Sequence, residues 1–337
     1  MSSPAGSDSR ATAGARPGGR RAAPGQGGIV MGVVRTGPLL NSAAASRADA
    51  RAALAILPGE PVRTFERPIP HAVSPDVLAG VDCELATRSG RGVRAVGTVL
   101  ARASVTGGRV LQGSAFTHAA AGSGEHRQPW SHYLSRPGSV ETIGKADWAD
   151  VAAGFLVPAA GPRGIALGSL CDQVLDTVQR SGGFDRRPPF RAGRTTLRWV
   201  LEPAEAGRGE HVEFAVGDGT DRLVRLTLKS PDRAAVAGWC EDLAPHDWLL
   251  TTVTEMISRG RLGEGAHAQV IDRIRPAVDQ LLHLWMPGVR VDRSLMPLWT
   301  DLDQKVRFQQ QWQNSIDRIR DQLALHTLTL LGSTAGG

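Results

Sequence analysis

The chain has 337 residues, of which 41% are hydrophobic and 21% charged, and it carries a formal net charge of +6 at pH 7. This size and composition predict a soluble globular protein whose core fills one large domain or two smaller ones. No apolar run approaches the roughly 20 residues that span a bilayer, so we expect no membrane partner.

The positive charge is concentrated in residues 1–28, where four arginines stand against one aspartate and give +3. The rest of the chain carries the other +3, which is not the electrostatic signature of nucleic-acid binding. Cys83, Cys171 and Cys240 form no Cys-x-x-Cys pair and no metal-binding spacing. They indicate reduced thiols in a cytoplasmic protein.

Residues 1–28 contain Ser, Gly, Ala, Pro and Arg with nothing to bury, and they predict a disordered basic tail. The pair Arg20-Arg21 resembles the start of a twin-arginine export signal. The apolar stretch that follows, Ile29–Val34, is too short for such a signal and runs into a charged residue, so we reject export. Met31 is an alternative translation start.

After the tail, the pattern predicts a strand, a helix and then further strands. The first strand covers Ile29–Arg35, and Ser42 is expected to cap an alanine-rich helix that ends near Leu57. The segment Arg63–Val73 is predicted to be extended, and the two prolines inside it confine it to the edge of a sheet.

The strongest hairpin signal is the turn Thr106-Gly107-Gly108, which Val93–Val105 and Arg109–His118 flank as strands. Two helices and then three short strands are predicted after it. The helices are Lys145–Leu156 and Leu167–Arg180, and the strands are Thr195–Leu201, His211–Val216 and Leu223–Leu228.

Ser230 and Pro231, an N-cap followed by proline at the first helical position, begin a block of about a hundred helical residues. The order of elements is mostly β, then α, then β, then this block, which predicts an α+β fold. We expect a mixed, mostly antiparallel β/α region over residues 29–229 and a C-terminal helical block over residues 230–332 packed on it.

A helix over Asp303–Leu331 is expected to end the block, with Thr300 and Asp303 forming a capping box and Gly332 stopping it. Its apolar positions recur every three or four residues and form one stripe. The stripe consists of Phe308, Trp312, Ile316, Ile319, Leu323, His326 and Leu330. Because the stripe widens toward its end, we expect other elements to cover that end. His326 is expected to be a hydrogen-bonded core residue.

The familiar catalytic motifs GxxxxGK[ST], GxGxxG, HExxH and GxSxG are absent, and we expect neither a metal nor a cofactor. Two Asp-x-x-x-His pairs remain, Asp242/His246 and Asp279/His283. This spacing brings a carboxylate and an imidazole together on one helical face, which suits a metal site or an oriented general base. The second pair lies opposite the apolar face of its predicted helix, so we interpret it as solvated.

On a continuous helix Asp242 and His246 would face inward, but Pro245 predicts a break there. The break would place His246 and Asp247 in a first helical turn, where an acid is favoured. We therefore favour a structural cap. The alternative is an enzyme whose metal- or acid/base-dependent pocket uses Asp242, His246 and His326 as catalytic candidates.

The densest positive patch consists of Arg186, Arg187, Arg191, Arg194 and Arg198. Guanidinium groups match phosphate oxygens, so phosphate or nucleic-acid contact is one interpretation. The run contains a single aromatic residue, and no known nucleic-acid-binding module surrounds it. We favour a solvated connector, or pairing with acids elsewhere in the chain.

Five tryptophans fall in the helical block and are interpreted as core residues. They are Trp239, Trp248, Trp285, Trp299 and Trp312. Trp130, His132 and Tyr133 lie instead in a predicted loop region. Amphipathic aromatic side chains are enriched at binding hot spots, which makes these three residues the interface candidates.

Four segments resemble an uncharacterised actinobacterial family known from Streptomyces, and the similarity runs from about Val30 to Gly332. The segments are PIPHAVSP (Pro68–Pro75), PWSHYL (Pro129–Leu134), CEDLAPHDWLL (Cys240–Leu250) and IRDQLALH (Ile319–His326). The family has no assigned activity and supplies no catalytic residues. Its genes lie beside those for a variant P-loop protein and a SAM-dependent methyltransferase, which implies membership of a multi-protein system.

The sequence therefore predicts a non-catalytic scaffold or adaptor that binds proteins encoded in the same gene cluster. This expectation rests on a large core without a recognisable catalytic constellation and on the resemblance. Two alternatives stay open, an enzyme with a pocket in the helical block and a nucleic-acid or phosphate binder that uses the run Arg186–Arg198.

Overall fold

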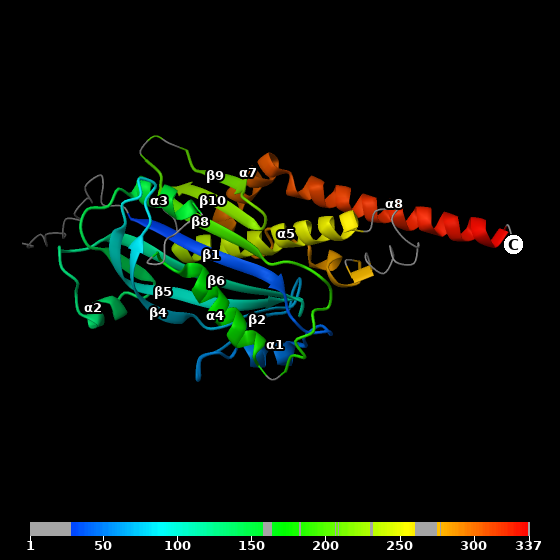
Figure 1. Cartoon of the computed structure of the whole chain (residues 1–337), viewed down its shortest axis with the longest axis horizontal. Coiled ribbons are helices and arrows are strands. Elements are labelled where there is room, and N and C mark those ends of the chain that lie inside the picture. Colours follow the sequence, from blue (N-terminus) through cyan, green and yellow to red (C-terminus); the bar gives the residue numbers. More distant parts are fainter. Residues whose placement is uncertain are drawn as a thin grey trace, which may run out of the picture.

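The computed structural model describes residues 28–157, 164–181, 183–205, 207, 209–229, 232–259, 275–276 and 278–335. Ten strands form one mixed sheet, and helices pack on both of its faces (Figure 1). The predicted α+β fold is thereby confirmed. Among the described residues, no helix has the length and apolar character needed to cross a membrane. The predicted disordered tail lies outside the described residues, apart from Gly28.

The strands follow the order β2-β3-β5-β7-β6-β1-β8-β10-β9, with β4 paired to β5 beside β3. Their bounds are β1 (Ile29–Pro38), β2 (Arg63–Phe65), β3 (His71–Val73), β4 (Val77–Leu85), β5 (Val93–Thr106), β6 (Val110–Ala121), β7 (Ser139–Thr142), β8 (Thr195–Pro203), β9 (His211–Val216) and β10 (Asp221–Leu228). Only the pairs β6–β7 and β8–β10 are parallel.

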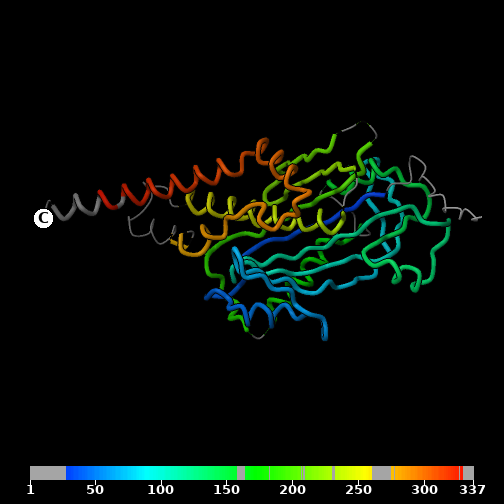
Figure 2. Tube along the Cα trace, turned by 180° about the vertical axis from the view of Figure 1, so that it is seen from behind, coloured from blue at the N-terminus to red at the C-terminus, as the bar shows by residue number. Residues whose placement is uncertain are grey.

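The helices divide between the two faces. Their bounds are α1 (Arg47–Leu54), α2 (Trp130–Leu134), α3 (Trp148–Leu156), α4 (Leu167–Gln179), α5 (Arg233–Arg259), α7 (Met296–Val306) and α8 (Phe308–Ala335). Short 3-10 helices cover Leu282–Leu284 and Arg293–Leu295. Helices α1, α3 and α4 share a core with one face, and α5, α7 and α8 share a core with the other (Figures 1 and 2).

The alternation of side chains along the central strand β1 explains the two cores. Val30 and Val34 point toward α5, whereas Met31 and Val33 point toward α4. Successive residues of a strand point to opposite faces, so a strand covered on both faces is apolar throughout. Every residue of β1 except Arg35 is buried.

Most predicted elements of the sheet are present. The strand at Ile29, the hairpin β5–β6 and the strands β8, β9 and β10 lie where the sequence predicts them. Gly107 and Gly108 have φ of +59° and +63°, which a turn of this kind requires and glycine adopts at little cost. Strands β2 and β3 form the predicted sheet edge. Three elements were not predicted: β4, α2 and β7.

The first helix begins later than predicted. Ser46, not Ser42, is its N-cap, and Ser46 and Asp49 form a reciprocal capping box. The Ser42 side chain instead donates to Asp185, in the connector that precedes β8. An acid three residues after the cap was the local signal that distinguishes the two serines.

The predicted break of α5 at Pro245 is wrong, because the helix runs without interruption from Arg233 to Arg259. Proline has no N–H for the carbonyl of Glu241, four residues earlier. That carbonyl accepts from the Gln112 side chain on β6 at 3.1 Å instead. The sheet therefore satisfies the group that the proline leaves free. The Ser230-Pro231 start lies outside the described residues, and Asp232 caps the helix by accepting from Ala234 at 2.9 Å.

The last helix also differs from its prediction. Arg307 adopts the left-handed conformation, with φ of +59°, and separates α7 from α8. Thr300 lies within α7, and Asp303 caps α8 by accepting from Gln309 N at 3.0 Å. The predicted capping box is therefore wrong. So is the predicted stop, because the helix passes through Gly332.

The end of α8 is not covered as predicted. Phe308, Trp312 and Ile319 are at most 5% exposed, whereas Leu328 is 65% exposed. Figures 1 and 2 show α8 extending beyond the sheet and α5. Among its described side chains, the apolar stripe is thus buried only in the first half of the helix. The side chain of His326 lies outside the described residues.

Candidate functional site

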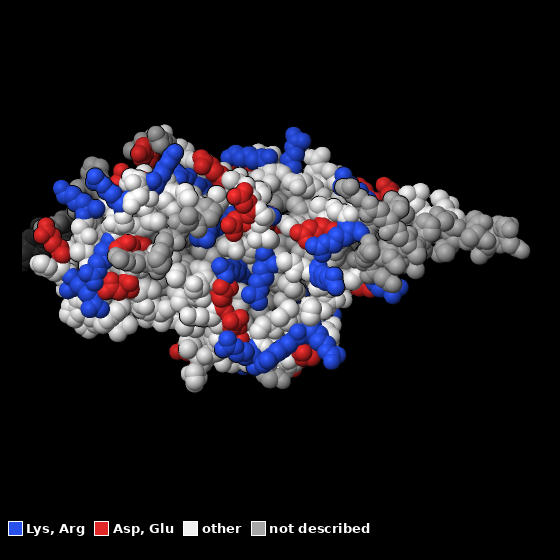
Figure 3. Space-filling view, in the orientation of Figure 1, with Lys and Arg blue, Asp and Glu red and all other residues white. Residues whose placement is uncertain are grey.

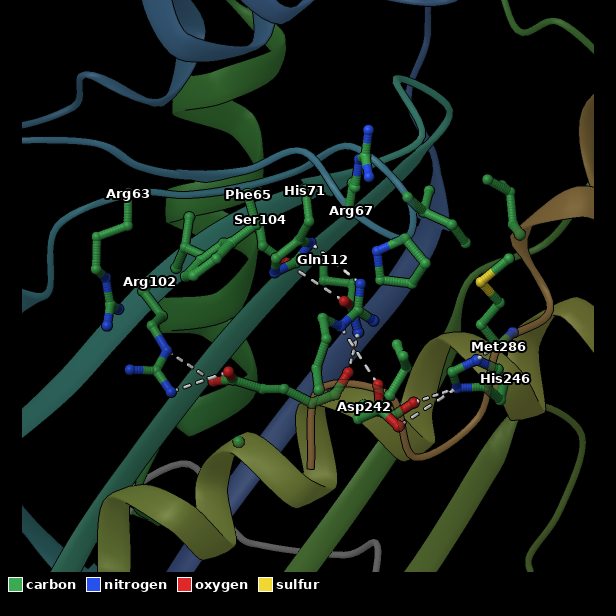
Figure 4. A pocket seen from close by; sticks show the side chains of 18 residues that line it. Arg63, Phe65, Arg67, His71, Arg102, Ser104, Gln112, Asp242, His246 and Met286 are labelled. Atoms are coloured by element: carbon green, nitrogen blue, oxygen red, sulfur yellow. Dashed lines mark hydrogen bonds and ion pairs between the residues drawn. The ribbon is translucent and has the colours of Figure 1, made fainter. Parts of the chain in front are cut away.

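A cavity of about 390 Å³ lies between the sheet and α5 (Figure 4). Its sheet side is formed by β2, β3, β5 and β6, and α5 with the segment 284–290 forms the opposite side. The size falls in the range of small-molecule sites, roughly 300–1,000 Å³.

Strand alternation selects the side chains on the sheet side. Residues two apart on a strand point to the same face of the sheet. The cavity-facing pairs are His71 and Val73 on β3, and Arg102 and Ser104 on β5. Val73 pairs with Ser104 in the antiparallel register, which places the two strands' cavity-facing residues side by side. The face that meets α5 is therefore polar at this point, although the same face is apolar along most of the sheet.

The helical side follows from the α-helical repeat. The cavity is lined on this side by Gly238, Glu241, Asp242 and His246. These are positions i, i+3, i+4 and i+8, which share one face of α5. A Cβ added at Gly238 would meet no atom within 4 Å. The missing side chain therefore leaves open space on the cavity side of the helix.

Four arginines from distant parts of the chain line this cavity. Arg102 donates to both carboxylate oxygens of Glu241, at 2.8 and 2.9 Å. The Nε of Arg290 lies 3.3 Å from Oδ1 of Asp242. Arg63 and Arg67 have no acidic partner among the described residues. Two of the four guanidinium groups are therefore left without a carboxylate.

His71 lies among these arginines and is neutral. Its Nδ1 accepts from Arg290 at 3.3 Å and lies 2.9 Å from the Thr106 hydroxyl. A guanidinium can only donate, so the ring proton resides on Nε2. Burial, reinforced by the charges of Arg290, Arg102 and Arg63, lowers the pKa of His71 from 6.5 to about 3. The imidazole is therefore a hydrogen-bond donor toward the cavity at neutral pH.

Asp242 and His246 both line the cavity, but their side chains form hydrogen bonds with backbone groups. His246 Nδ1 donates to the carbonyl of Asp242 at 2.5 Å, and its Nε2 accepts from Met286 N at 3.2 Å. Asp242 Oδ2 accepts from Gly288 N at 2.8 Å. Burial lowers the pKa of His246, which matches an imidazole held neutral between two backbone groups. The pair thus fastens the segment 284–290 to α5.

This arrangement assigns Asp242 and His246 a structural role, although not as the predicted cap of a first turn. Asp247 is buried and pairs with Arg222 at 2.9 Å on another side of the helix. An acid/base role for Asp242, His246 and His326 stays a prediction. The other pair, Asp279 and His283, is exposed, as expected for a solvated face.

The run of five arginines follows the connector from α4 to β8. Arg186, Arg187, Arg191 and Arg194 are exposed, and Arg198 on β8 is half-buried. The backbone N–H of Arg187 donates to Asp185 Oδ1 at 2.9 Å. None of the five guanidinium groups forms a salt bridge among the described residues, so the predicted pairing with acids elsewhere in the chain is not found there. On the face shown in Figure 3, basic and acidic side chains are interspersed. Phosphate or nucleic-acid contact through this run stays a prediction.

The three interface candidates have different surroundings. Trp130 is 39% exposed and packs edge-to-face on Tyr133. Tyr133 is buried, and its hydroxyl accepts from Gln128 N. His132 lies 3.0 Å from the buried Glu141. Only Trp130 of the three therefore presents a large apolar surface to solvent.

The tryptophans of the helical block are core residues, as predicted. Trp239, Trp248, Trp299 and Trp312 are at most 8% exposed. Trp285 is half-buried and stacks on Trp312, with ring centroids 4.3 Å apart and an interplanar angle of 4°. Trp239 packs edge-to-face on Trp299, and Trp248 packs on Phe190, so these rings are occupied by other aromatic side chains of the protein.

Sequence reasoning missed Arg63, His71, Arg102 and Arg290. No spacing connects them, because the sheet and the segment 284–290 bring them together only in the folded chain. One signal was available: the segments Pro68–Pro75 and Cys240–Leu250, which carry the family resemblance, both contribute cavity residues.

Comparisons with known proteins supply no relative for this chain. No family model, no curated protein and no solved structure matches it. Within the described residues, no three or more His, Cys, Asp or Glu side chains gather as a metal-binding group. The function is therefore inferred from the geometry of the cavity.

Proposed function

We propose that this protein binds a small organic anion, without catalysis, in the cavity between its sheet and α5. The observation that carries the proposal is that four arginines, Arg63, Arg67, Arg102 and Arg290, line one cavity together with His71 (Figure 4). Guanidinium groups are the preferred partners of carboxylate and phosphate oxygens, because their planar forks donate two parallel hydrogen bonds.

The surroundings favour binding over chemistry. A general base must accept a proton near the working pH, and His71, with a pKa of about 3, does not. His246 has both ring nitrogens engaged with the backbone. Among the described residues that line the cavity, no imidazole is therefore available as a base.

A matched pair of glycine variants tests the proposal. Gly238→Leu places a side chain in the open space, and Gly238→Ala adds only a methyl group. Acetate, benzoate, citrate, phenyl phosphate and inorganic phosphate are added to each protein at constant ionic strength. A ligand that binds the folded state raises its Tm. We expect at least one anion to raise the Tm of the wild type and of Gly238→Ala, but not that of Gly238→Leu. Equal shifts in all three proteins, or none, would contradict the proposal.

A second candidate function is the scaffold or adaptor role that the sequence predicts. The exposed Leu323 and Leu328 on the projecting part of α8 favour it, since apolar side chains on a protruding helix suit protein contact. By resemblance, the partners are the P-loop protein and the methyltransferase of the same gene cluster, and the location is cytoplasmic. Affinity purification from the native host tests this role, and recovery of neither neighbour would count against it.

A further inference from the structure

Building on the proposed anion site, we infer that its ligand is a monocarboxylic acid with an apolar body. The carboxylate binds to Arg63 and to Nε2–H of His71, and the apolar body lies against Phe65. This inference rests on the proposed function and adds the charge and shape of the ligand to it.

The charges around His71 favour a single negative charge at that point. Arg102 is engaged by Glu241, and Arg290 lies against Asp242. Arg63 and Arg67 are the cavity arginines without an acidic partner among the described residues. Arg63 is the diagonal neighbour of His71, whereas the side chain of Arg67 points away from Asp242 and His246 in Figure 4. A second negative charge beside His71 would therefore share Arg63 with the first, and its desolvation would be poorly compensated.

The geometry supplies two donors for one carboxylate. Arg63 pairs with Val73 in the antiparallel register and Phe65 pairs with His71, so Arg63 is a diagonal neighbour of His71 on the same face. Diagonal neighbours lie within reach of a long side chain. Among the described residues, no group accepts the proton on Nε2 of His71. A carboxylate placed between them accepts from both residues.

Part of the exposed lining of the cavity is apolar. Phe65, Met286 and Val289 line the cavity, although they are 53%, 37% and 49% exposed. Phe65 is the one beside His71, because their rings stack with centroids 6.1 Å apart and an interplanar angle of 29°. An apolar body gains free energy by covering these side chains, whereas a fully hydrophilic anion does not.

Four small probes separate the requirements for charge and for an apolar body. Benzoate and hexanoate carry both, acetate lacks the body, and benzamide lacks the charge. Ligand-observed saturation-transfer NMR and calorimetry with the full-length protein measure their affinities. We expect benzoate and hexanoate to bind, acetate to bind roughly tenfold or more weakly, and benzamide to show no saturable binding. Phenyl phosphate, which has the same ring and more negative charge, should bind more weakly than benzoate.

Two substitutions at exposed positions assign the contacts. Arg63→Gln should weaken benzoate binding about tenfold or more, because it removes a charge-assisted hydrogen bond. The matched control Arg51→Gln removes an exposed arginine of α1, which does not line the cavity, and should leave the affinity unchanged. Phe65→Ala should reduce the preference for benzoate over acetate. Circular dichroism confirms that each variant is folded.

The possible failures are distinguishable. If no anion binds in the cavity, the proposed function itself is lost. If inorganic phosphate or phenyl phosphate binds more tightly than benzoate and Gly238→Leu abolishes that binding, the proposed function stands and the monocarboxylate inference is overturned. An unchanged affinity in Arg63→Gln also overturns it. So does a peptide with a free C-terminus that binds more tightly than benzoate and hexanoate.

Discussion

At the scale of single residues, His71 shows how the fold fixes the protonation of a group. The ring is neutral because burial removes it from water and three guanidinium groups oppose a further positive charge. Its tautomer is fixed because Arg290 donates to Nδ1. The contacts that orient the ring as a donor therefore also make its protonation unfavourable. This effect is measurable as a dependence of the free energy of unfolding on pH.

We predict that stability falls as the pH is lowered from about 6.5 toward 3. The folded pKa of about 3 lies below the unfolded value of 6.5, so the unfolded state takes up the proton first in this window. At pH 5 the loss from His71 alone is about 2 kcal/mol, or 1.5 pH units at about 1.4 kcal/mol each. Urea denaturation at pH 7 and pH 5 measures it. His71→Gln should lose about 2 kcal/mol less than the wild type over this interval. Equal losses would show that His71 is not the titrating group.

A second prediction concerns the buried pair of Arg222 and Asp247, whose side chains are 6% and 7% exposed. Burial raises the pKa of Asp247, and Arg222 opposes that rise. Asp247→Ala leaves a buried guanidinium without its partner and should cost about 3–5 kcal/mol. The double variant Arg222→Met/Asp247→Leu removes both charges and should recover most of that loss. Chemical denaturation measures both. A double variant no more stable than Asp247→Ala would contradict this account.

At the scale of elements, α5 remains continuous through Pro245 because a neighbouring strand completes its hydrogen bonding. The Glu241 carbonyl, which a proline cannot serve, accepts from Gln112. Gln112 also donates to Thr36 at 3.2 Å, so one side chain joins α5, β6 and β1. The contact between helix and sheet at the cavity floor therefore depends on a polar network within a largely apolar interface.

This network predicts that substitutions at Gln112 and Pro245, which are far apart in the sequence, have non-additive effects on stability. Gln112→Met should cost about 1–3 kcal/mol, because it leaves the Glu241 carbonyl buried without a donor. In the background of Pro245→Ala, the new N–H of residue 245 serves that carbonyl, and the same substitution should cost less. The other contacts of Gln112 are lost equally in both backgrounds. A double-mutant cycle measured by urea denaturation gives the coupling, and additive effects would contradict it.

Features that depend on neighbouring residues were predicted from the sequence. Features that depend on contacts between distant parts of the chain were not. The turn at Gly107-Gly108 needs only glycine and its neighbours, and it was predicted. The effect of Pro245 depends on the Gln112 side chain, which lies 129 residues before the Glu241 carbonyl that it serves, so local rules predicted a break that is absent. The start of α8 depends on the left-handed Arg307, which no local signal marked.

The candidate site was less predictable than the fold for the same reason. Asp242 and His246 were singled out by their i, i+4 spacing, and they do lie at the cavity. Their availability for chemistry depends on the backbone of Met286 and Gly288, which spacing does not reveal. Arg63 belongs to a three-residue edge strand, and its role appears only when β2, β3 and β5 align.

At the scale of the whole molecule, α8 joins a buried beginning to a projecting end. Phe308 packs edge-to-face on Phe214 of β9, and Trp312 stacks on Trp285. Beyond Ile319, the described leucines Leu323 and Leu328 are 37% and 65% exposed. We therefore expect the buried first half of α8 to contribute to stability and its projecting second half to bind a partner.

We predict that a chain ending after Gln322 keeps the stability of the full chain to within about 1 kcal/mol, because the leucines described beyond that point, Leu323, Leu325 and Leu328, are 37%, 52% and 65% exposed. Trp312→Ala should instead cost about 3–5 kcal/mol, since it removes a buried aromatic ring from the contact between α8 and the body. Urea denaturation compares the two proteins. The shortened chain should also lose the partners that the full chain retains in affinity purification from the host. A shortened chain as unstable as Trp312→Ala would place the end of α8 in the core and leave the adaptor role without its surface.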